Sequence, residues 1–187
     1  MISSKVATLV VELQSISPMP DDDTLNHLPD ENDPLEKLQN ILSTLKQETQ
    51  VQYPLDLILP LLEVFGVGTG NGVFWSILTL IEQYPNLEEV YPLIQQATKS
   101  ANAGTRVWSC RLLGRRRQEE DELFFIARLQ DEVAEVRQSA LTGILMLAQR
   151  YDMTHLIPVV ESLLQDENWE VQDVAEDTLE ILREPKK

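Results

Sequence analysis

Apolar residues near the start of the chain recur with the period of an amphipathic helix. The first such stripe lies within residues 1–17 and consists of Val6, Leu9, Val10, Leu13 and Ile16. The second lies within residues 34–48 and consists of Leu35, Leu38, Ile41, Leu42 and Leu45. Pro34 stands where proline is favoured, in the first turn of a helix. The pattern therefore predicts two helices in this part of the chain.

The segment between them, residues 17–34, has a different composition. It holds four prolines and six acidic residues but no lysine or arginine. Such a segment has too little apolar surface to offset the entropy lost on ordering. We therefore expect an acidic, proline-rich linker or irregular loop, within an N-terminal region of residues 1–52.

From residue 53 onward the sequence repeats itself. Equivalent residues, with their separations, are Trp75 and Trp108 (33), Arg106 and Arg137 (31), and Asp131 and Asp166 (35). A repeat of this length is typical of helix pairs that bury their apolar faces by stacking on neighbouring pairs. We expect a repeat domain of residues 53–187 with four helix–turn–helix units, at residues 53–84, 85–117, 118–151 and 152–184.

A small residue recurs at one point of each second helix. These residues are Ser76, Ser109, Ala140 and Ala175. A close approach of stacked helices explains them, since a large side chain would overpack the interface.

The last two units resemble HEAT repeats, in the form Leu-x-Asp-x-x-x-x-Val-Arg-x-x-Ala. The matching residues are Leu129, Asp131, Val136, Arg137 and Ala140, then Leu164, Asp166, Val171 and Ala175. Gln172 replaces the arginine of the last unit, and Ser100 stands where the aspartate of residues 85–117 would fall. The repeat is also shorter than the roughly 40 residues usual for this type.

The resemblance implies an all-α fold, a right-handed α-solenoid of about four short HEAT-like hairpins with capping helices at the N-terminal end. It also implies that Arg106, Arg137, Asp131 and Asp166 form a structural ladder between stacked units. The stretches "NGVFWSILTLIEQYP" and "RVWSCRLLGRRR" more faintly resemble small bacterial HEAT-like immunity proteins. Proteins of that type neutralise a toxin made by the same cell.

The net charge indicates which kinds of partner the protein binds, and the cysteine content indicates its cellular compartment. The formal net charge of −16 argues against nucleic acid and anionic membranes as partners, and it would attract a basic protein. No apolar run is long enough to span a membrane. The single cysteine, Cys110, suits a reducing compartment, and the N-terminus does not read as a secretory signal. We expect a cytoplasmic protein.

The stretch "FGVGTGNGVFWS", residues 65–76, holds four of the seven glycines. The glycines alternate strictly, which fits neither a dinucleotide-binding fingerprint nor a phosphate-binding loop with its lysine. We interpret the loop as a connection between two helices in which glycines adopt left-handed conformations. The sequence leaves open whether residues 66–72 take part in binding.

No residues form a recognisable catalytic or metal-binding pattern. His27, His155 and Cys110 share no ligand-type spacing, and no acid–base couple stands out among the carboxylates. We therefore expect no cofactor, no metal and no enzymatic activity. HEAT-like lyases that attach tetrapyrroles are an enzymatic alternative, but no candidate catalytic group supports it.

Candidate protein-binding residues lie on the second helices. Taking equivalent outward positions unit by unit gives Phe74 and Leu78, Val107 and Arg111, Gln138 and Thr142, then Asp173 and Asp177. Beside them stand Trp75 and Trp108, and Trp169 is the best candidate for an exposed anchor. Arg115–Arg117 precede a run of acids, so they either pair locally or dock an acidic group.

These observations favour a non-enzymatic protein that binds a basic partner, most concretely an immunity-type inhibitor of a toxin. The alternative is a scaffold or assembly factor that docks on a larger protein complex.

Overall fold

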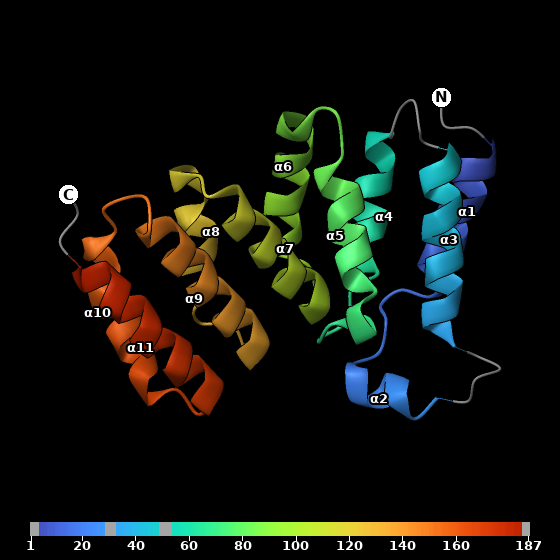
Figure 1. Ribbon diagram of the computed structural model, residues 1–187. Helices are drawn as coiled ribbons and strands as arrows, with labels where there is room; N and C mark the ends of the chain where they lie inside the picture. Colours follow the sequence, from blue (N-terminus) through green and yellow to red (C-terminus); the bar gives the residue numbers. More distant parts are fainter. Residues whose placement is uncertain (1–3, 29–32, 49–53, 185–187) are drawn as a thin grey trace. The chain divides into compact units, whose positions relative to one another are not determined.

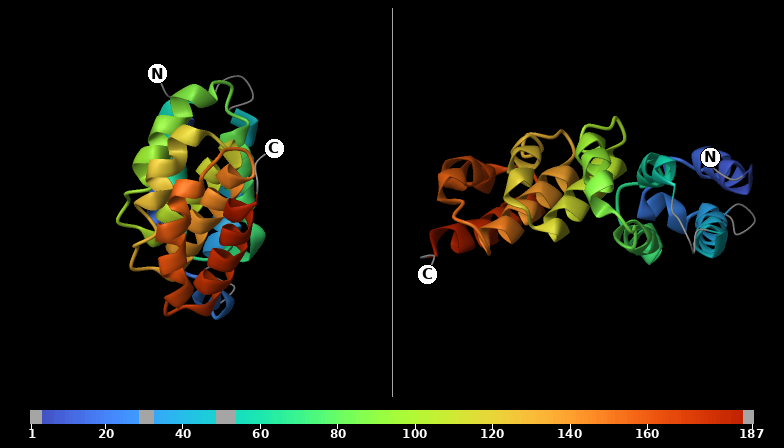
Figure 2. Two further views of the ribbon diagram at one scale, coloured as in Figure 1. Left: turned by 90° about the vertical axis from the view of Figure 1, so that its left-hand side faces the viewer. Right: turned by 90° about the horizontal axis from the view of Figure 1, so that it is seen from above.

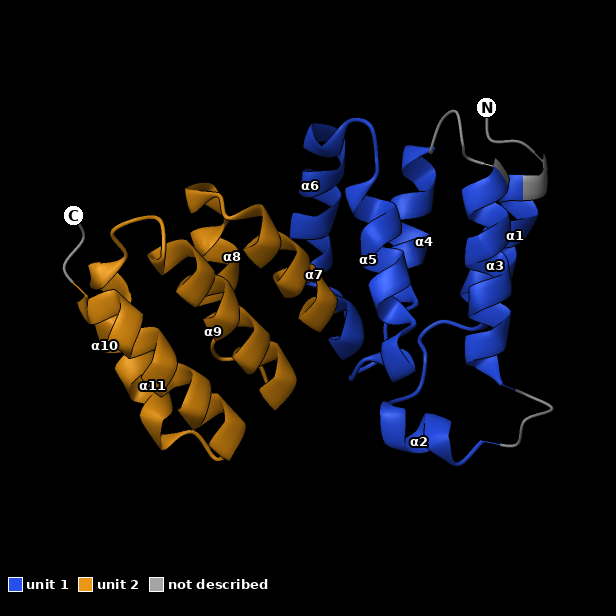
Figure 3. Ribbon diagram, in the orientation of Figure 1, with its two compact units in different colours: residues 1–105 blue, residues 106–187 orange. Residues whose placement is uncertain are grey.

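The computed structural model describes residues 4–28, 33–48 and 54–184. Within these ranges the chain is helical and contains no strand, as the sequence predicted (Figure 1). The chain divides into two compact units, residues 1–105 and residues 106–187 (Figure 3). The division falls inside helix α7 (Ala103–Arg116) rather than near residue 52.

Unit 1 contains the two predicted amphipathic helices, α1 (Ser4–Ser15) and α3 (Pro34–Glu48), which pack against each other. Their apolar stripes are buried at Val6, Leu9, Leu13, Leu35, Leu38, Ile41, Leu42 and Leu45. Each such side chain contributes about 1.5–3 kcal/mol when it is removed from water. Packing, more than intrinsic helix propensity, therefore stabilises this pair.

The rest of unit 1 is built from shorter helices. They are α4 (Ile58–Glu63), α5 (Phe74–Glu82) and α6 (Leu87–Ala97), with single 3-10 turns at Leu55–Leu57 and Gly70–Gly72. Helix α4 packs against α1 and α6, and α3 packs against α5. The rings of Phe65 and Phe74 meet edge to face with their centroids 5.4 Å apart.

Unit 2 consists of the remainder of α7 and four further helices. They are α8 (Glu122–Ile126), α9 (Ala134–Ala148), α10 (Ile157–Glu161) and α11 (Trp169–Arg183), with 3-10 turns at Glu119–Asp121, Thr154–Leu156 and Ser162–Gln165. Helix α9 packs against α8 and α11, and α10 and α11 lie side by side (Figures 1 and 2). Gly143 of α9 has no room for a side chain, because the ring of Phe125 lies against it.

Each of the four predicted helix–turn–helix units holds two helices, in the order α4–α5, α6–α7, α8–α9 and α10–α11. The first helix has only six residues in α4 and five in each of α8 and α10.

The small residues predicted for close helix packing are buried in three of the four units. Ser109, Ala140 and Ala175 have no exposed surface. The prediction is wrong for Ser76, which is exposed. Helix α5 buries positions 74, 77, 78 and 81 on one side. On the side of Ser76, burial begins only one turn later, at Leu80.

The acidic segment is more ordered than its composition predicts. Residues Asp22–Asn26 form the short helix α2, and the Asp21 carboxylate caps it by accepting a hydrogen bond from the Thr24 N–H at 2.7 Å. Met19 and Leu25 are buried, so two apolar side chains fix a segment that is otherwise polar. Residues 29–32, which also belong to the expected linker, lie outside the described residues.

Candidate protein-binding surface

Two arginines of unit 2, on α7 and α9, each bind an aspartate in the connection that precedes the next long helix. The Arg106 guanidinium donates to both carboxylate oxygens of Asp131, from Nε at 2.8 Å and from Nη2 at 2.7 Å. Arg137 binds Asp166 in the same bidentate way, at 2.8 Å and 2.6 Å. All four side chains are nearly inaccessible to water. These are the contacts that the resemblance to HEAT repeats implied for these residues, and their position makes them structural.

The two aspartates of these pairs are held in the ionised form. Burial acts to raise the pKa of Asp131 and of Asp166, but hydrogen bonds from the paired arginine and from a backbone N–H hold both pKa values below the ordinary 3.8. The N–H groups belong to Val133 and Asn168. Removal of Arg137 would therefore leave the Asp166 carboxylate without its buried counter-charge, whereas Asp131 also pairs with Arg128 at 3.4 Å.

At Ser100 and Gln172, which depart from the HEAT-like sequence pattern, hydrogen bonds like those of the aspartates and arginines are still formed. Arg137 also donates from Nη1 to the carbonyl oxygen of Asp131 at 2.8 Å, and Gln172 donates from Nε2 to the carbonyl oxygen of Asp166 at 2.5 Å. Ser100 accepts a hydrogen bond from the N–H two residues further on, as both aspartates do. The replacements thus preserve the local geometry and remove only the charge.

The glycine-rich loop of unit 1 binds a carboxylate of the chain itself. Left-handed conformations occur at Gly68, Gly70, Asn71 and Gly72, which confirms the role predicted for the glycines. The Asp22 carboxylate accepts hydrogen bonds from the Thr69 N–H at 2.9 Å, the Thr69 hydroxyl at 2.9 Å and the Gly70 N–H at 2.7 Å. Burial acts to raise the pKa of Asp22, but these bonds hold it below the ordinary 3.8. The anion that this loop holds is therefore Asp22.

Four residues predicted at or beside an outward groove are buried instead. Phe74, Leu78, Val107 and Trp108 have almost no exposed surface. The prediction that Phe74, Leu78 and Val107 point outward is wrong, because the positions that are polar in later units carry the core side chains here. In α5, for example, Phe74 and Leu78 belong to the apolar stripe of the helix.

The other candidate binding residues of the first two helix–turn–helix units are at least partly exposed. Trp75 is 47% exposed, and Arg115 lies on the surface at the end of α7. Arg111 is half-buried, and its guanidinium carbon lies 4.6 Å from the centre of the Trp108 ring. The arginine cluster is divided, since Arg116 binds Glu120 and Asp121 while Arg115 and Arg117 are exposed.

Helix α11 exposes one aromatic and several acidic side chains. Trp169 is 70% exposed at its first turn. Exposed acidic side chains follow along the helix at Glu170, Asp173, Glu176, Asp177 and Glu180. We call Trp169 and these five acids the α11 face. The one basic residue of helix α11, Arg183, is bound to Glu161 at 2.6 Å.

The carboxylates of the α11 face have no counter-charge among the residues that the structure describes. In the part of the chain that the structure describes, no ion pair involves Glu170, Asp173, Glu176, Asp177 or Glu180. The predicted residues Trp169, Asp173 and Asp177 therefore lie together on one helix, and this surface carries an excess of negative charge. Sequence reasoning missed Glu176 and Glu180, although they follow Trp169 by seven and eleven residues and so share its side of the helix.

An open hollow of about 520 Å³ lies beside the C-terminal half of α11. Its apolar part is formed by Leu164 and Leu179, and its charged rim by Glu176, Glu180, Arg183 and Glu184. Leu164 precedes α11 in the chain and Leu179 is buried within it, so the two leucines form a floor. This hollow adds an apolar contact area to the acidic face.

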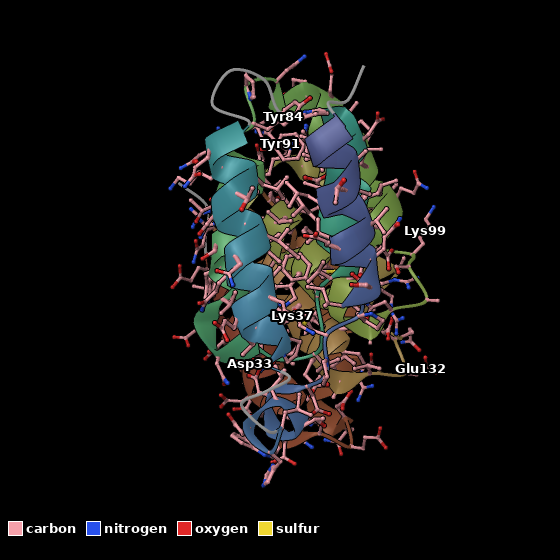
Figure 4. The ribbon with its side chains drawn as sticks, turned by 90° about the vertical axis from the view of Figure 1, so that its right-hand side faces the viewer. Asp33, Lys37, Tyr84, Tyr91, Lys99 and Glu132 are labelled. Atoms are coloured by element: carbon pink, nitrogen blue, oxygen red, sulfur yellow. The ribbon has the colours of Figure 1, made fainter. Side chains whose placement is uncertain are left out.

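A second hollow, of about 370 Å³, is lined by residues of α1 and α3 in unit 1, the two helices in front in Figure 4. Leu9, Ile16 and Ile41 line it, together with the opposite charges of Glu12 and Lys37. Because these charges offset each other, this hollow does not favour a partner of either sign.

No cluster of histidine, cysteine or carboxylate side chains suited to a metal ion occurs among residues 4–28, 33–48 and 54–184. Over the same ranges, no helix is both long and apolar enough to cross a membrane. Burial raises the pKa of the Cys110 thiol to about 12, so this cysteine is a packing residue and not a nucleophile at neutral pH.

Comparison with known proteins does not add a family or a relative. No protein-family model matches the sequence, and no curated protein is similar to it.

Proposed function

We propose that this protein is a non-enzymatic, cytoplasmic binding protein of the HEAT-like type. Its four helix pairs stack as a right-handed α-solenoid, which the N-terminal helices cap. Helix pairs in register with the sequence repeat support this arrangement, as do the two arginine–aspartate contacts of unit 2. A repeat scaffold by itself does not determine function, so the partner is argued from the surface.

The partner that we propose is a basic protein. The observation that carries this proposal is the α11 face, where carboxylates that form no ion pair with a described residue accompany the exposed Trp169. An exposed aromatic side chain supplies apolar contact area, and surface charge of one sign accelerates the approach of an oppositely charged protein. Most concretely, the protein is an immunity-type inhibitor that captures a basic toxin of the same cell.

Binding kinetics with a basic toxin encoded beside this chain, measured over a range of salt concentrations, test the proposal. We expect the association rate constant to fall about tenfold or more as salt rises, because the attraction is long-range. Replacing Asp173 and Asp177 by asparagine should slow association, and Trp169→Ala should mainly speed dissociation. The matched control replaces Glu36 by glutamine and Asp56 by asparagine, which removes two exposed charges from unit 1.

Protection of cells from that toxin, lost on Trp169→Ala, would complete the case for an inhibitor. Association that is independent of salt, or equal loss with the control variant, would contradict the assignment of the α11 face. Stable co-purification with a large complex, with no protection from the toxin, would favour the scaffold alternative.

A further inference from the structure

The hollow beside α11 has an apolar floor and an acidic rim, and one kind of side chain can contact both. Its floor, formed by Leu164 and Leu179, offers apolar contact. Its rim carries the carboxylates of Glu176, Glu180 and Glu184. A purely apolar side chain would leave those carboxylates without a counter-charge, and an acidic one would be repelled. Lysine and arginine instead place their aliphatic stems on apolar surface while the charged end stays at the rim.

We infer that this hollow receives a lysine or arginine side chain from a basic segment of the partner protein. This inference rests on the proposed function, since it names the group that the α11 face recognises. The aliphatic stem of the incoming side chain lies on the two leucines, and its cationic end meets the carboxylates of Glu176 and Glu180. Charge-assisted hydrogen bonds of this kind are stronger than neutral ones.

Arg183 shows that such a side chain fits this surface. It lines the same hollow, and its guanidinium reaches the Glu161 carboxylate at 2.6 Å, across a separation of 22 residues in sequence. The charge of Arg183 is therefore offset by Glu161. Glu176 and Glu180, in contrast, form no ion pair within the described part of the chain and are available to a second cation.

The position of Trp169 is consistent with an elongated partner segment. Glu176 follows Trp169 by seven residues and Glu180 by eleven, which places all three on one side of α11. At 1.5 Å per residue, Trp169 and Glu176 are separated by roughly 10 Å along the helix axis. A segment that places one side chain on Trp169 can therefore place another in the hollow a few residues away.

The test uses the full chain with isotope-labelled leucine methyl groups and NMR titration with blocked peptides. The probe is an eight-residue peptide of alternating lysine and alanine. One matched peptide carries arginine in place of lysine, and another carries norleucine, which keeps the alkyl stem without the charge. We expect the lysine and arginine peptides to shift the methyl resonances of Leu164 and Leu179, and the norleucine peptide to leave them unchanged.

The double variant Glu176→Gln, Glu180→Gln should weaken peptide binding by about twofold to thirtyfold, the range for two exposed ion pairs. The control Asp173→Asn, Asp177→Asn removes the same charge from the same helix outside the hollow. It should weaken binding less and still give the Leu164 and Leu179 shifts.

The inference is overturned if the lysine peptide leaves both leucines unshifted, or if the Glu176 and Glu180 variant binds it as tightly as the unaltered chain. In either case, toxin binding that still depends on Trp169 and Asp173 would leave the proposed function standing. If the lysine peptide enters the hollow but no basic protein binds, the proposed function fails and the recognition of the side chain stands.

Discussion

Replacing Asp22 by asparagine removes the negative charge that the glycine-rich loop of unit 1 binds. The Asp22 carboxylate lies 47 residues from the loop in sequence and accepts three hydrogen bonds from Thr69 and Gly70, at 2.7 to 2.9 Å. Asparagine keeps the shape and one acceptor oxygen, but its amide nitrogen would face N–H donors. The change therefore weakens the contact between α2 and the loop without opening a cavity.

The magnitude follows from the number and exposure of these bonds. A hydrogen bond to a charged group contributes about 1.5–3 kcal/mol when it is well shielded from water. Asp22 is half-exposed, so solvent screening reduces the value of each bond. We expect Asp22→Asn to lower the free energy of unfolding of unit 1 by about 1 kcal/mol, and Asp22→Ala by about 2 kcal/mol.

Hydrogen exchange at the Thr69 and Gly70 amides provides the direct assay, with urea unfolding as the global measurement. Asp22→Asn should speed exchange at both amides by about fivefold, which corresponds to about 1 kcal/mol. The neighbouring variant Asp23→Asn is the matched control, since the Asp23 side chain is 94% exposed. Unchanged exchange in Asp22→Asn, or the same change in both variants, would refute the reasoning.

The same contact predicts a direction of pH dependence. Because the pKa of Asp22 is lower in the folded chain than its ordinary 3.8, its stabilisation is complete above that value. It is lost as the pH falls through the lower, folded-state pKa. Amide exchange at Thr69 and Gly70, corrected for its intrinsic rate, should therefore accelerate below about pH 4 in the unaltered chain. In Asp22→Asn this acid-dependent step should be absent.

Three further predictions concern unit 2. Arg137→Ala should destabilise unit 2 by about 3 kcal/mol in urea unfolding, because it leaves Asp166 without a counter-charge. The control Arg183→Gln breaks an exposed pair and should cost under about 1 kcal/mol. Ser109→Ala should leave the stability unchanged or raise it by up to about 1 kcal/mol, since the buried Ser109 hydroxyl has no hydrogen-bond partner among the described residues. Alanine already occupies the equivalent positions 140 and 175. Clear destabilisation would point to a bound water. Cys110 should resist alkylation at pH 8 in the folded chain and react in denaturant, because burial raises its pKa to about 12; mass spectrometry of the alkylated protein measures both.

The helices could be predicted from the sequence where apolar spacing and a terminal residue agree. For α3, the stripe from Leu35 to Leu45 and the helix-starting Pro34 predicted residues 34–48, and the helix spans Pro34–Glu48. The contacts of Arg106 and Arg137 with Asp131 and Asp166 were implied by the resemblance to HEAT repeats, and the structure has both contacts. The prediction of α3 used local spacing, whereas the prediction of these contacts used a repeated pattern shared with other proteins.

The candidate surface was predictable only in part, because equivalence in a repeat does not fix exposure. Asp173 is exposed, but its equivalents Val107 and Phe74 are buried. The prediction of an irregular linker at residues 17–34 was incomplete for a related reason. It was based on the composition of the whole segment, which does not show that Met19 and Leu25 are buried or that the Asp22 carboxylate binds the glycine-rich loop. The signals that could have identified it are the cap pattern at Asp21 to Thr24 and the two isolated apolar residues.

The net charge of −16 gives no indication of where an approaching partner meets the strongest field. In unit 2, Arg106, Arg116, Arg137 and Arg183 are each bound to a carboxylate of the same unit, so they neutralise acids within the structure. None of these four pairs involves Glu170, Asp173, Glu176, Asp177 or Glu180 of α11, whose side chains face solvent. Salt distinguishes the two groups of charges, because mobile ions screen exposed charges and reach nearly buried pairs far less. Raising the salt concentration should therefore slow capture of a basic partner at the α11 face, while the ladder of Arg106 and Arg137, and with it the folding of unit 2, persists.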